Sequence, residues 1–296
     1  MMKALKLLVA TLLIAGCSEK QTAESGSGKP VIYSVNYPLA YFAERLAGDR
    51  AEIVFPEMEG DPAFWEPTPE QVAEFQEADL ILLNGASYAK WVPKVALPQS
   101  KLVDTSAGFS ERFIALDGTV THTHGPGGAH AHGDLAFTTW LDPKLAIHQA
   151  EAIHAALSSL GVSSPAEFRK LANDLAALDD KLKDAFAEVG KQPLLGSHPV
   201  YQYLERAYGL DMESVHWEPD AEPDADQWRD LEDILEARSA RIMLWEDEPL
   251  ATTKAKLDEK GIASIVFNPS GNRPADSDFM AVMERNSRNL SIPATD

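Results

Sequence analysis

The sequence predicts an α/β protein built as two α/β lobes bridged by one long helix. Two stretches, 30–142 and 191–296, alternate short apolar runs with helical segments, as chains do when they form parallel sheets covered by helices. Between them, residues 163–190 contain good helix formers with no strand-like run or turn cluster, and they end at Gly190. This pattern therefore predicts two sheets and a connecting helix.

The first half begins with the strand-like run VIYSV and continues with alternating strands and helices. Thr68 and Pro69 mark the start of one helix, because threonine caps helix N-termini and proline suits the first helical position. The predicted strands are 31–35, 51–56, 79–85 and 101–106, and the predicted helices are 38–48 and 68–78.

The second half repeats the same alternation after two consecutive helices. The predicted helices are 142–161, 163–190, 200–210, 224–240 and 250–261, and the predicted strands are 193–198, 241–246 and 264–269. No short sequence repeat accompanies this alternation. Open α/β sheets bind ligands at the carboxyl ends of their strands, and clefts between lobes are favoured sites, so we expect a ligand between the two halves.

The first residues predict export and a lipid anchor. Residues 1–16 combine two lysines with a short apolar run, which is typical of a signal peptide, and LIAGC resembles the lipobox that precedes a lipid-modified cysteine. We expect lipidation of Cys17, a flexible tether over 17–29, and a location at the periplasmic or extracytoplasmic face of a membrane. The alternative is that Cys17, the single cysteine of the chain, is a buried free thiol.

The charge of the chain excludes one class of partner. With 46 acidic against 26 basic side chains, the formal net charge is −20. Such a chain repels the phosphates of nucleic acids and of anionic membrane surfaces. We therefore expect no nucleic-acid partner.

A histidine-rich loop, 121–134, carries four of the eight histidines among glycines and a proline. Its candidate metal ligands are spaced in two i, i+2 pairs, which point to one face in extended backbone: His122, His124, His130 and His132. Imidazole suits zinc, copper and nickel, and Asp134 can orient a ligand. The alternative is a disordered linker. HAHGD also resembles a metallohydrolase motif, but Leu135 follows it where that motif has a histidine, so we do not expect an enzyme.

Several ordered motifs resemble the zinc/manganese solute-binding lipoproteins of ABC importers, the TroA-like or cluster A-I family. They are VNYPLAYFAERLAGD (35–49), EGDPAFWEPTPEQVAEFQEADLILLNG (59–85), TTWLDP (138–143), GSHPVYQYLERAYGL (196–210), AEPDADQ (221–227) and VFNPSG (266–271). The resemblance implies two lobes bridged by a long helix, a metal ion in the cleft and an ABC permease as partner. It divides the chain into an N-terminal lobe (30–142), linking helices (143–190) and a C-terminal lobe (191–296). We expect a monomer.

The resemblance also implies four ligand positions, of which one is retained. They fall on Ala63, Thr138, His198 and Asn268, so only His198 keeps a strong donor. Zinc prefers three or four nitrogen, sulfur or carboxylate donors, and an isolated histidine does not hold it tightly.

Nearby residues offer replacements for the lost ligands. Glu66 lies on the loop after Ala63, and Glu246 follows a predicted strand together with Asp247 and Glu248. The alternative for each of these acids is a solvated surface charge. Carboxylates around His198 would favour Mn²⁺ over zinc, whereas the histidine-rich loop favours Zn²⁺. His216, beside Trp217, is a further candidate ligand, and the favoured alternative is a half-buried structural histidine. His148 and His154 are six residues apart on a helix, hence on different faces, which indicates surface or packing roles.

Three hypotheses follow from the sequence. The first is a lipid-anchored solute-binding protein that delivers a metal ion, zinc before manganese, to an ABC importer. The second is a family member with a degenerate cleft that acts as a histidine-loop metal chaperone or as a scaffold. The third is a zinc hydrolase, the least favoured of the three.

Overall fold

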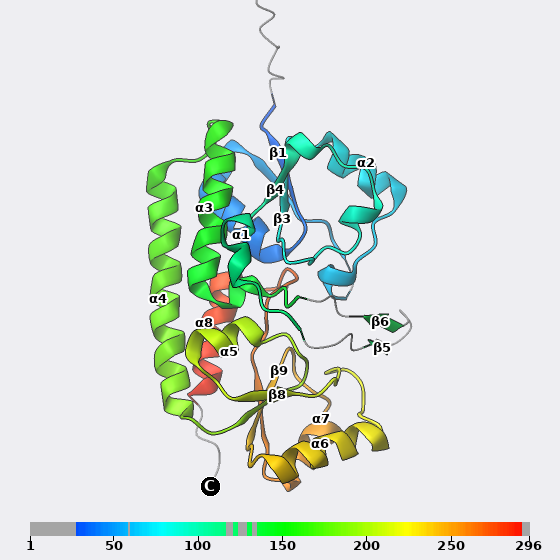
Figure 1. Ribbon diagram of the computed structural model, residues 1–296. Helices are drawn as coiled ribbons and strands as arrows, with labels where there is room; N and C mark the ends of the chain where they lie inside the picture. The colour runs from blue at the N-terminus through cyan, green and yellow to red at the C-terminus, as the bar shows by residue number, and fades with distance from the viewer. Residues whose placement is uncertain (1–27, 59, 117–120, 124–128, 132–134, 292–296) are drawn as a thin grey trace, which may run out of the picture.

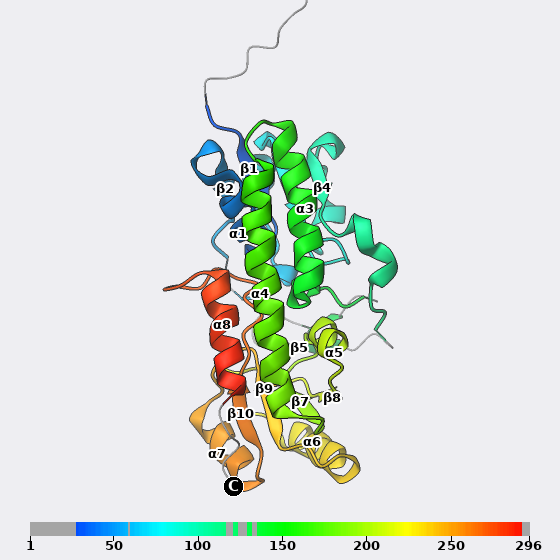
Figure 2. The same cartoon turned by 90° about the vertical axis from the view of Figure 1, so that its left-hand side faces the viewer.

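The computed structural model describes residues 28–58, 60–116, 121–123, 129–131 and 135–291. It contains two four-stranded parallel sheets, one in each lobe, with a long helix running along both (Figures 1 and 2). The predicted fold class is confirmed. The predicted signal peptide and Cys17 lie outside the described residues, so they remain predictions.

The N-terminal sheet has the strand order β2-β1-β3-β4. Its strands are β1 (Val31–Ser34), β2 (Glu52–Val54), β3 (Leu80–Leu83) and β4 (Leu102–Asp104). Ile32 of β1 pairs with Ile53 and Leu80 on either side, and it is fully buried. A central strand flanked by parallel neighbours is apolar on both faces, as the sequence of β1 and β3 predicts.

The helices of this lobe begin where the sequence signals them. α1 (Tyr37–Ala47) is capped by the Asn36 side chain, which accepts a hydrogen bond from the Leu39 amide. α2 (Pro69–Glu77) starts with a reciprocal capping box between Thr68 and Gln71. Such caps satisfy amides that have no partner within the helix.

The C-terminal sheet repeats the topology of the first, with the order β8-β7-β9-β10. Its strands are β7 (Leu194–Gly196), β8 (Met212–Ser214), β9 (Ile242–Trp245) and β10 (Ala263–Val266), and its helices are α5 (Gln202–Tyr208), α6 (Ala225–Ala237) and α7 (Ala251–Glu259). The strand β8 was not predicted, because its sequence MES places a glutamate between a methionine and a serine and forms no apolar run.

The helix α4 (Pro165–Val189) spans both lobes (Figure 2). Its 25 residues reach about 37 Å at the helical rise of 1.5 Å per residue. One face of it is buried, with the side chains of Leu171, Leu175, Leu178, Leu182, Ala185 and Phe186. α3 (Pro143–Ser159) and α8 (Phe279–Leu290) pack against this helix. A helix buried against both lobes restricts how far they can separate.

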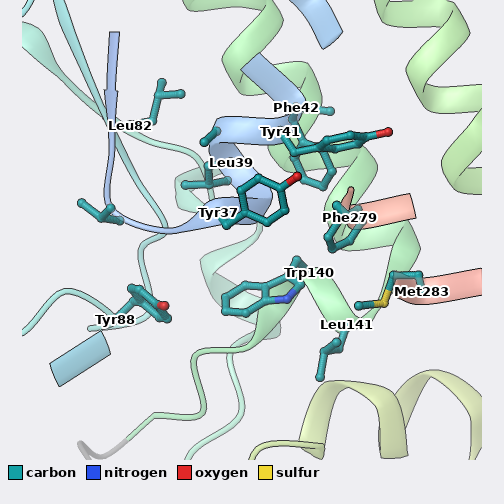
Figure 3. Close-up of a cluster of buried hydrophobic side chains, with 14 of the residues drawn as sticks. Tyr37, Leu39, Tyr41, Phe42, Leu82, Tyr88, Trp140, Leu141, Phe279 and Met283 are labelled. Carbon is teal, nitrogen blue, oxygen red and sulfur yellow. The ribbon is translucent and has the colours of Figure 1, made fainter. Parts of the chain in front are cut away.

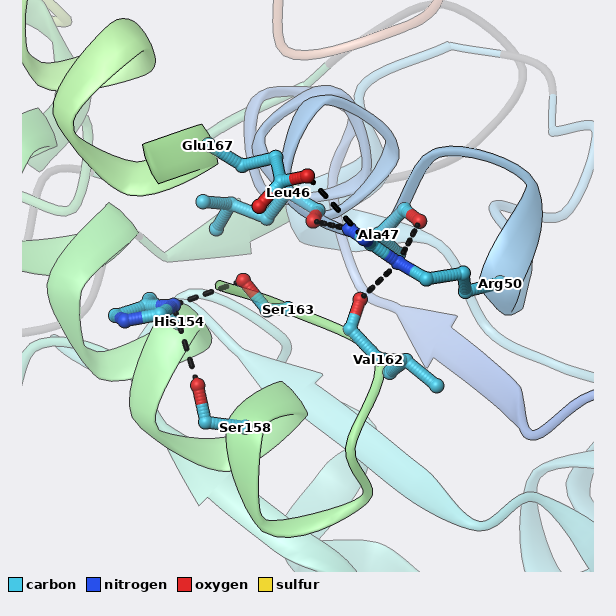
Figure 4. Close-up of polar contacts among 8 residues, drawn as sticks. All are labelled: Leu46, Ala47, Arg50, His154, Ser158, Val162, Ser163 and Glu167. Atoms are coloured by element: carbon cyan, nitrogen blue, oxygen red, sulfur yellow. Dashed lines mark hydrogen bonds and ion pairs between the residues drawn. The ribbon is translucent and has the colours of Figure 1, made fainter. Parts of the chain in front are cut away.

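The turn between α3 and α4 is fixed by polar contacts (Figure 4). The Arg50 guanidinium donates to the carbonyls of Val162 at 3.1 Å and Leu46 at 2.9 Å, and it pairs with Glu167 at 3.2 Å. His154 Nδ1 lies 2.8 Å from Ser163 Oγ, and its ring stacks on Phe168. The start of the long helix is thereby tied to the end of α1.

The C-terminal helix α8, which the sequence analysis did not predict, joins the two halves of the core. Phe279 is fully buried against Tyr41 and Phe42 of α1, with ring centroids 5.6 and 5.4 Å apart (Figure 3). Trp140 donates its indole N–H to the Pro269 carbonyl at 2.8 Å. These contacts connect segments more than 120 residues apart in the chain.

Short elements complete the described structure. The strands β5 (Thr121–Thr123) and β6 (Ala129–Ala131) form an antiparallel pair. The 3₁₀ helices are η1 (Gly48–Arg50), η2 (Pro62–Phe64), η3 (Val92–Lys94), η4 (Gln99–Lys101), η5 (Ala107–Arg112) and η7 (Thr139–Leu141). Across the described ranges, no helix combines the length and the apolar character that crossing a membrane requires.

The packing of α8 against α1 generates a stability prediction. Replacing Phe279→Ala removes a fully buried ring and should lower the free energy of unfolding by about 3–5 kcal/mol, measured by urea denaturation. The matched control Leu160→Ala, at an exposed position after α3, should change it by less than about 0.5 kcal/mol. Equal losses in the two variants would show that α8 does not stabilise the fold.

Candidate metal-binding cleft

A cavity of about 400 Å³ lies between the two lobes. Residues from both lobes line it, and most of them follow the carboxyl ends of strands or belong to the loops after them. The lining consists of Gly60, Asp61, Pro62, Tyr88, Phe137, Thr138, Trp140, Val200, Glu218, Pro219, Asp220, Glu246, Asp247, Asn268, Pro269, Ser270, Gly271 and Asn272.

The strand order explains why polar groups gather on the C-terminal side of this cavity. In the order β8-β7-β9-β10, the strand that follows β7 in the chain lies on one side of it, and the strand that follows β9 lies on the opposite side. Open α/β sheets bind ligands at such a switch point between two strands. His198 follows β7 and Glu246 follows β9. Chain topology therefore brings these two side chains to the same edge of the sheet.

His198 lies beside two acidic residues of the C-terminal wall, Glu218 and Glu246. It is 4% exposed, and its Nδ1 lies 3.6 Å from Glu218 Oε1 and 4.0 Å from Glu246 Oε1. The His216 ring lies edge-on to the His198 ring, with centroids 5.6 Å apart. Two carboxylates of the cleft lining and a second imidazole thus surround His198.

The backbone at position 196, two residues before His198, lies so close to its neighbours that glycine is required there. A Cβ atom on Gly196 would lie 2.6 Å from Ser214 Oγ and 3.1 Å from the His198 carbonyl oxygen. Any larger residue would therefore push β7 away from β8 or displace the turn that carries His198.

His216 lies beside His198, with the two ring centroids 5.6 Å apart, and it is not among the residues that line the cavity. The adjoining Trp217 is buried, and its amide donates to the Ser197 carbonyl at 2.7 Å, which fixes the segment against the turn of His198. Gln227 Nε2 donates to the His216 carbonyl at 2.9 Å. Recognising β8 would have revealed His216 and Glu218 as residues after a strand end.

Glu246 lies beside His198, as the sequence analysis predicts for a residue after this strand. Burial, with smaller contributions from the charges of Asp61 and Glu218, raises the pKa of Glu246 to about 8. Its side chain retains 32% of its surface area exposed to solvent. With a pKa of about 8, the carboxyl group of Glu246 is largely protonated at neutral pH.

Asp61 brings a charge from the N-terminal lobe. Its carboxylate accepts a hydrogen bond from the Ala63 amide at 2.8 Å and so caps η2. The same charge raises the pKa of Glu246, in the opposite lobe. The acidic groups of the cleft therefore face one another across it, and a cation between them would relieve their repulsion.

The three substituted ligand positions have structural roles. Ala63 is fully buried in η2. Thr138 Oγ1 donates to the Val200 carbonyl at 2.5 Å, which ties the N-terminal lobe to the turn after His198. Asn268 Oδ1 accepts from the Ser270 amide at 2.7 Å. Ala63 thus has no donor atom, and the side-chain oxygens of Thr138 and Asn268 each take part in a hydrogen bond within the protein.

Glu66 lies outside the cleft lining. Its carboxylate accepts a hydrogen bond from Lys94 Nζ at 2.7 Å, and its side chain is 73% exposed. This ion pair lowers the pKa of Glu66. The expected replacement ligand on this loop is therefore paired with a lysine at the surface, and Asp61 is the acid that the loop brings to the cleft.

The histidine-rich loop is described only in part. Its backbone folds back on itself, with His122 opposite His130 in the β5–β6 pair, on the side of the molecule away from α4 (Figure 1). His124 and His132 lie outside the described residues. His148 is exposed beside Glu151 and His154 packs on Phe168, in accord with their predicted surface and packing roles.

The nitrogen and oxygen donors near the cleft lie slightly farther apart than donors that share one zinc ion. Two donors that share a tetrahedral zinc ion lie about 3.3 Å apart, because each is about 2.0–2.1 Å from the ion. The contacts of 3.6 and 4.0 Å from His198 exceed this distance by less than 1 Å. Within the described part of the chain, no three His, Cys, Asp or Glu side chains form a ready-made site.

The raised pKa of Glu246 generates a prediction for the metal-free protein. In the unfolded state Glu246 loses its proton above its ordinary pKa of about 4.5, whereas in the folded state it keeps the proton up to about pH 8. Between these pH values folding requires the uptake of a proton, so the free energy of unfolding falls as the pH rises. Glu246→Gln should therefore stabilise the protein more at pH 8 than at pH 5.5, measured by urea denaturation with a chelator present. An equal effect at both pH values would show that the carboxyl group is not perturbed.

Comparison with known proteins places this architecture in a family. The sequence profile of ZnuA, described as zinc-uptake complex component A periplasmic, matches residues 32–292. The zinc-binding lipoprotein AdcA of Streptococcus pneumoniae is 28% identical over 310 residues, covering 98% of this chain and 60% of AdcA. The high-affinity zinc uptake system protein ZnuA of Bacillus subtilis is 25% identical, covering 80% of this chain and 77% of that protein.

Solved structures agree on the fold. The Zn(II)-bound ZnuA-like domain of Streptococcus pneumoniae AdcA has a TM-score of 0.72 at 24% identity, covering 89% of this chain and 98% of that domain. The metal-dependent lipoprotein YcdH of Bacillus subtilis has a TM-score of 0.72 at 20% identity, covering 88% and 96% of the two chains. This chain therefore belongs to the zinc-uptake complex component A periplasmic family.

Proposed function

We propose that this protein is an extracytoplasmic solute-binding protein that captures a divalent metal ion, zinc before manganese, in the cleft between its lobes and delivers it to an ABC permease. The observation that carries the proposal is that His198 lies within 4.0 Å of two carboxylates of the cleft lining, Glu218 and Glu246, with the His216 ring beside it. The membership of the family supports the same role.

The donor set supports a site that differs from four-histidine or three-histidine sites. His198 and His216 supply nitrogen donors, while Glu218 and Glu246 supply oxygen donors, and Asp61 adds charge from the opposite lobe. Imidazole suits zinc, and carboxylates suit both zinc and harder ions such as Mn²⁺. We therefore place zinc first and manganese second.

Binding in this cleft needs only a small adjustment. The Thr138–Val200 and Trp140–Pro269 hydrogen bonds already join the lobes at the cleft, and α4 spans both. An ion that draws the donors together by less than 1 Å would close the site without a large rotation. The carboxyl of Glu246 would lose its proton on binding, so metal affinity rises with pH up to about 8.

The histidine-rich loop and the predicted lipid anchor complete the proposal. His122, His124, His130 and His132 would capture zinc near the cleft, and the antiparallel backbone pairing of residues 121–123 with 129–131 brings two of these positions opposite each other. Lipidation of Cys17 would hold the protein at the membrane that contains the permease. The domain bounds 30–142, 143–190 and 191–296 remain part of this proposal.

A second candidate function is a metal chaperone or scaffold in which the loop alone binds the ion. It is favoured by one observation, namely that no three metal-binding side chains form a ready-made site within the residues that the structure describes.

Calorimetric titration of the metal-free protein with Zn²⁺ and Mn²⁺ tests the proposal. His198→Ala should weaken binding in the cleft at least 10-fold, since even residues that only support a metal ligand contribute about 10- to 100-fold to affinity. Deleting residues 121–133 should remove a weaker site and leave the cleft intact. Zinc should bind more tightly than manganese.

The control for His198→Ala is His148→Ala, which removes an exposed histidine of α3 and should leave both sites unchanged. If the loop deletion abolishes all binding while His198→Ala has no effect, the cleft does not bind metal and the second candidate is correct.

A further inference from the structure

After β10, a short segment of the C-terminal lobe lies against the N-terminal lobe. In this segment, residues 269–273, the Gly271 carbonyl accepts a hydrogen bond from the Tyr37 amide at 3.0 Å. Arg273 pairs with Glu44 at 2.7 Å, and its guanidinium carbon lies 4.7 Å from the centroid of the Tyr37 ring. The segment is therefore held on α1 of the opposite lobe, at the place where it borders the cavity.

Asn272, inside this segment, joins the two lobes through its side chain. Its Nδ2 donates to the carbonyl of Met58 at 3.1 Å and to that of Gly60 at 3.3 Å, both in the loop after β2. Its Oδ1 accepts a hydrogen bond from the Arg273 amide at 2.9 Å. These bonds fix which way the side-chain amide points, because exchanging its two ends would place an oxygen against two carbonyl oxygens.

The loop that Asn272 holds leads directly into Asp61. Within the described part of the chain, Met58 and Gly60 form no hydrogen bond other than those from Asn272. Gly60 has a left-handed φ of 73°, so the chain turns immediately before Asp61. On the other side of Asp61, Ala63 in η2 is fully buried. Asp61 thus lies where a buried turn meets a loop whose hydrogen bonds come from the opposite lobe.

Asp61 brings the negative charge of the N-terminal lobe to the cavity. Among the described residues of the lining, the other acids all belong to the C-terminal lobe and are Glu218, Asp220, Glu246 and Asp247. The charge of Asp61 acts on Glu246 across the cleft. Because the energy between two charges falls with their separation, the attraction of Asp61 for a cation depends on how firmly its loop holds it at the cavity.

We infer that Asn272 is a positioning residue for metal capture, because it holds the loop that leads into Asp61 and so keeps this carboxylate at the cavity. The inference rests on the proposed function. Without the two bonds from Asn272, the loop samples other positions, and an ion in the cleft loses part of the attraction of Asp61. Both polar ends of the Asn272 side chain bond to the protein backbone, so its effect on affinity acts through Asp61.

Calorimetric titration of the metal-free full-length protein with Zn²⁺ tests the inference. Asn272→Ala should weaken binding at the His198-dependent site about 5-fold, which is the usual effect of losing a neutral hydrogen bond. The matched control Asn289→Ala removes a bond of the same kind, from Nδ2 to the Val266 carbonyl at 2.9 Å, but within the C-terminal lobe. The control should leave the zinc affinity unchanged.

A second background separates the positioning of Asp61 from general support of the fold. Asp61→Asn removes the charge but keeps a side-chain oxygen that can cap η2, and it should weaken zinc binding at least as much as Asn272→Ala. In this background, Asn272→Ala should have no further effect on the zinc affinity, because the charge that it positions is already absent. A residue with a structural role alone would weaken binding by the same factor in both backgrounds.

The results that overturn the inference differ in what they say of the proposed function. If zinc binds at a His198-dependent site and Asn272→Ala has no effect, or the same effect with and without the charge of Asp61, the inference is wrong and the proposed function stands. If the unmodified protein binds no zinc at a His198-dependent site, the proposed function fails together with this inference.

Discussion

The buried face of α4 is the constraint on which the rest of the structure depends. Its apolar stripe, from Leu171 to Phe186, packs against both lobes, so the carboxyl ends of two separate parallel sheets are held facing each other across one cleft. Each sheet has the same strand order, and the switch point of the C-terminal sheet delivers His198 and Glu246 to the cleft. A rigid bridge of this kind allows small adjustments of the donors rather than a wide opening and closing.

The candidate cleft keeps the family's architecture, whereas the ligand positions that the resemblance implies carry other side chains. At two of these positions this chain has Thr138, which joins the lobes through the Val200 carbonyl, and Asn268, which supports the turn of Ser270. The polar groups that lie near His198 are instead His216, Glu218 and Glu246.

The sequence was sufficient to predict most of the fold but only part of the site. Thr68, Pro69 and Gly190 mark helix ends through local chemistry, and apolar runs such as 79–85 mark buried strands, so both could be predicted without tertiary information. His198 could be identified through the family resemblance, and Glu246 because it lies at the end of an apolar strand run. His216 was not recognised as following a strand, because β8 has the sequence MES, which is not an apolar run. The pairing of Glu66 with Lys94 depends on a contact between residues 28 positions apart. The helix α8 could also have been predicted, because its buried positions Phe279, Val282, Met283, Asn286 and Leu290 follow the helical repeat and Asp278 caps its start.

The central claim is that a divalent ion binds in the cleft at His198. A crystal structure of the zinc-loaded protein, with anomalous diffraction recorded at the zinc absorption edge, tests it most directly. The account predicts an anomalous peak about 2.0–2.1 Å from an imidazole nitrogen of His198, with a carboxylate oxygen of Glu218 or Glu246 in the same coordination shell. A fully loaded crystal with zinc only at the histidine-rich loop, and none near His198, would contradict it.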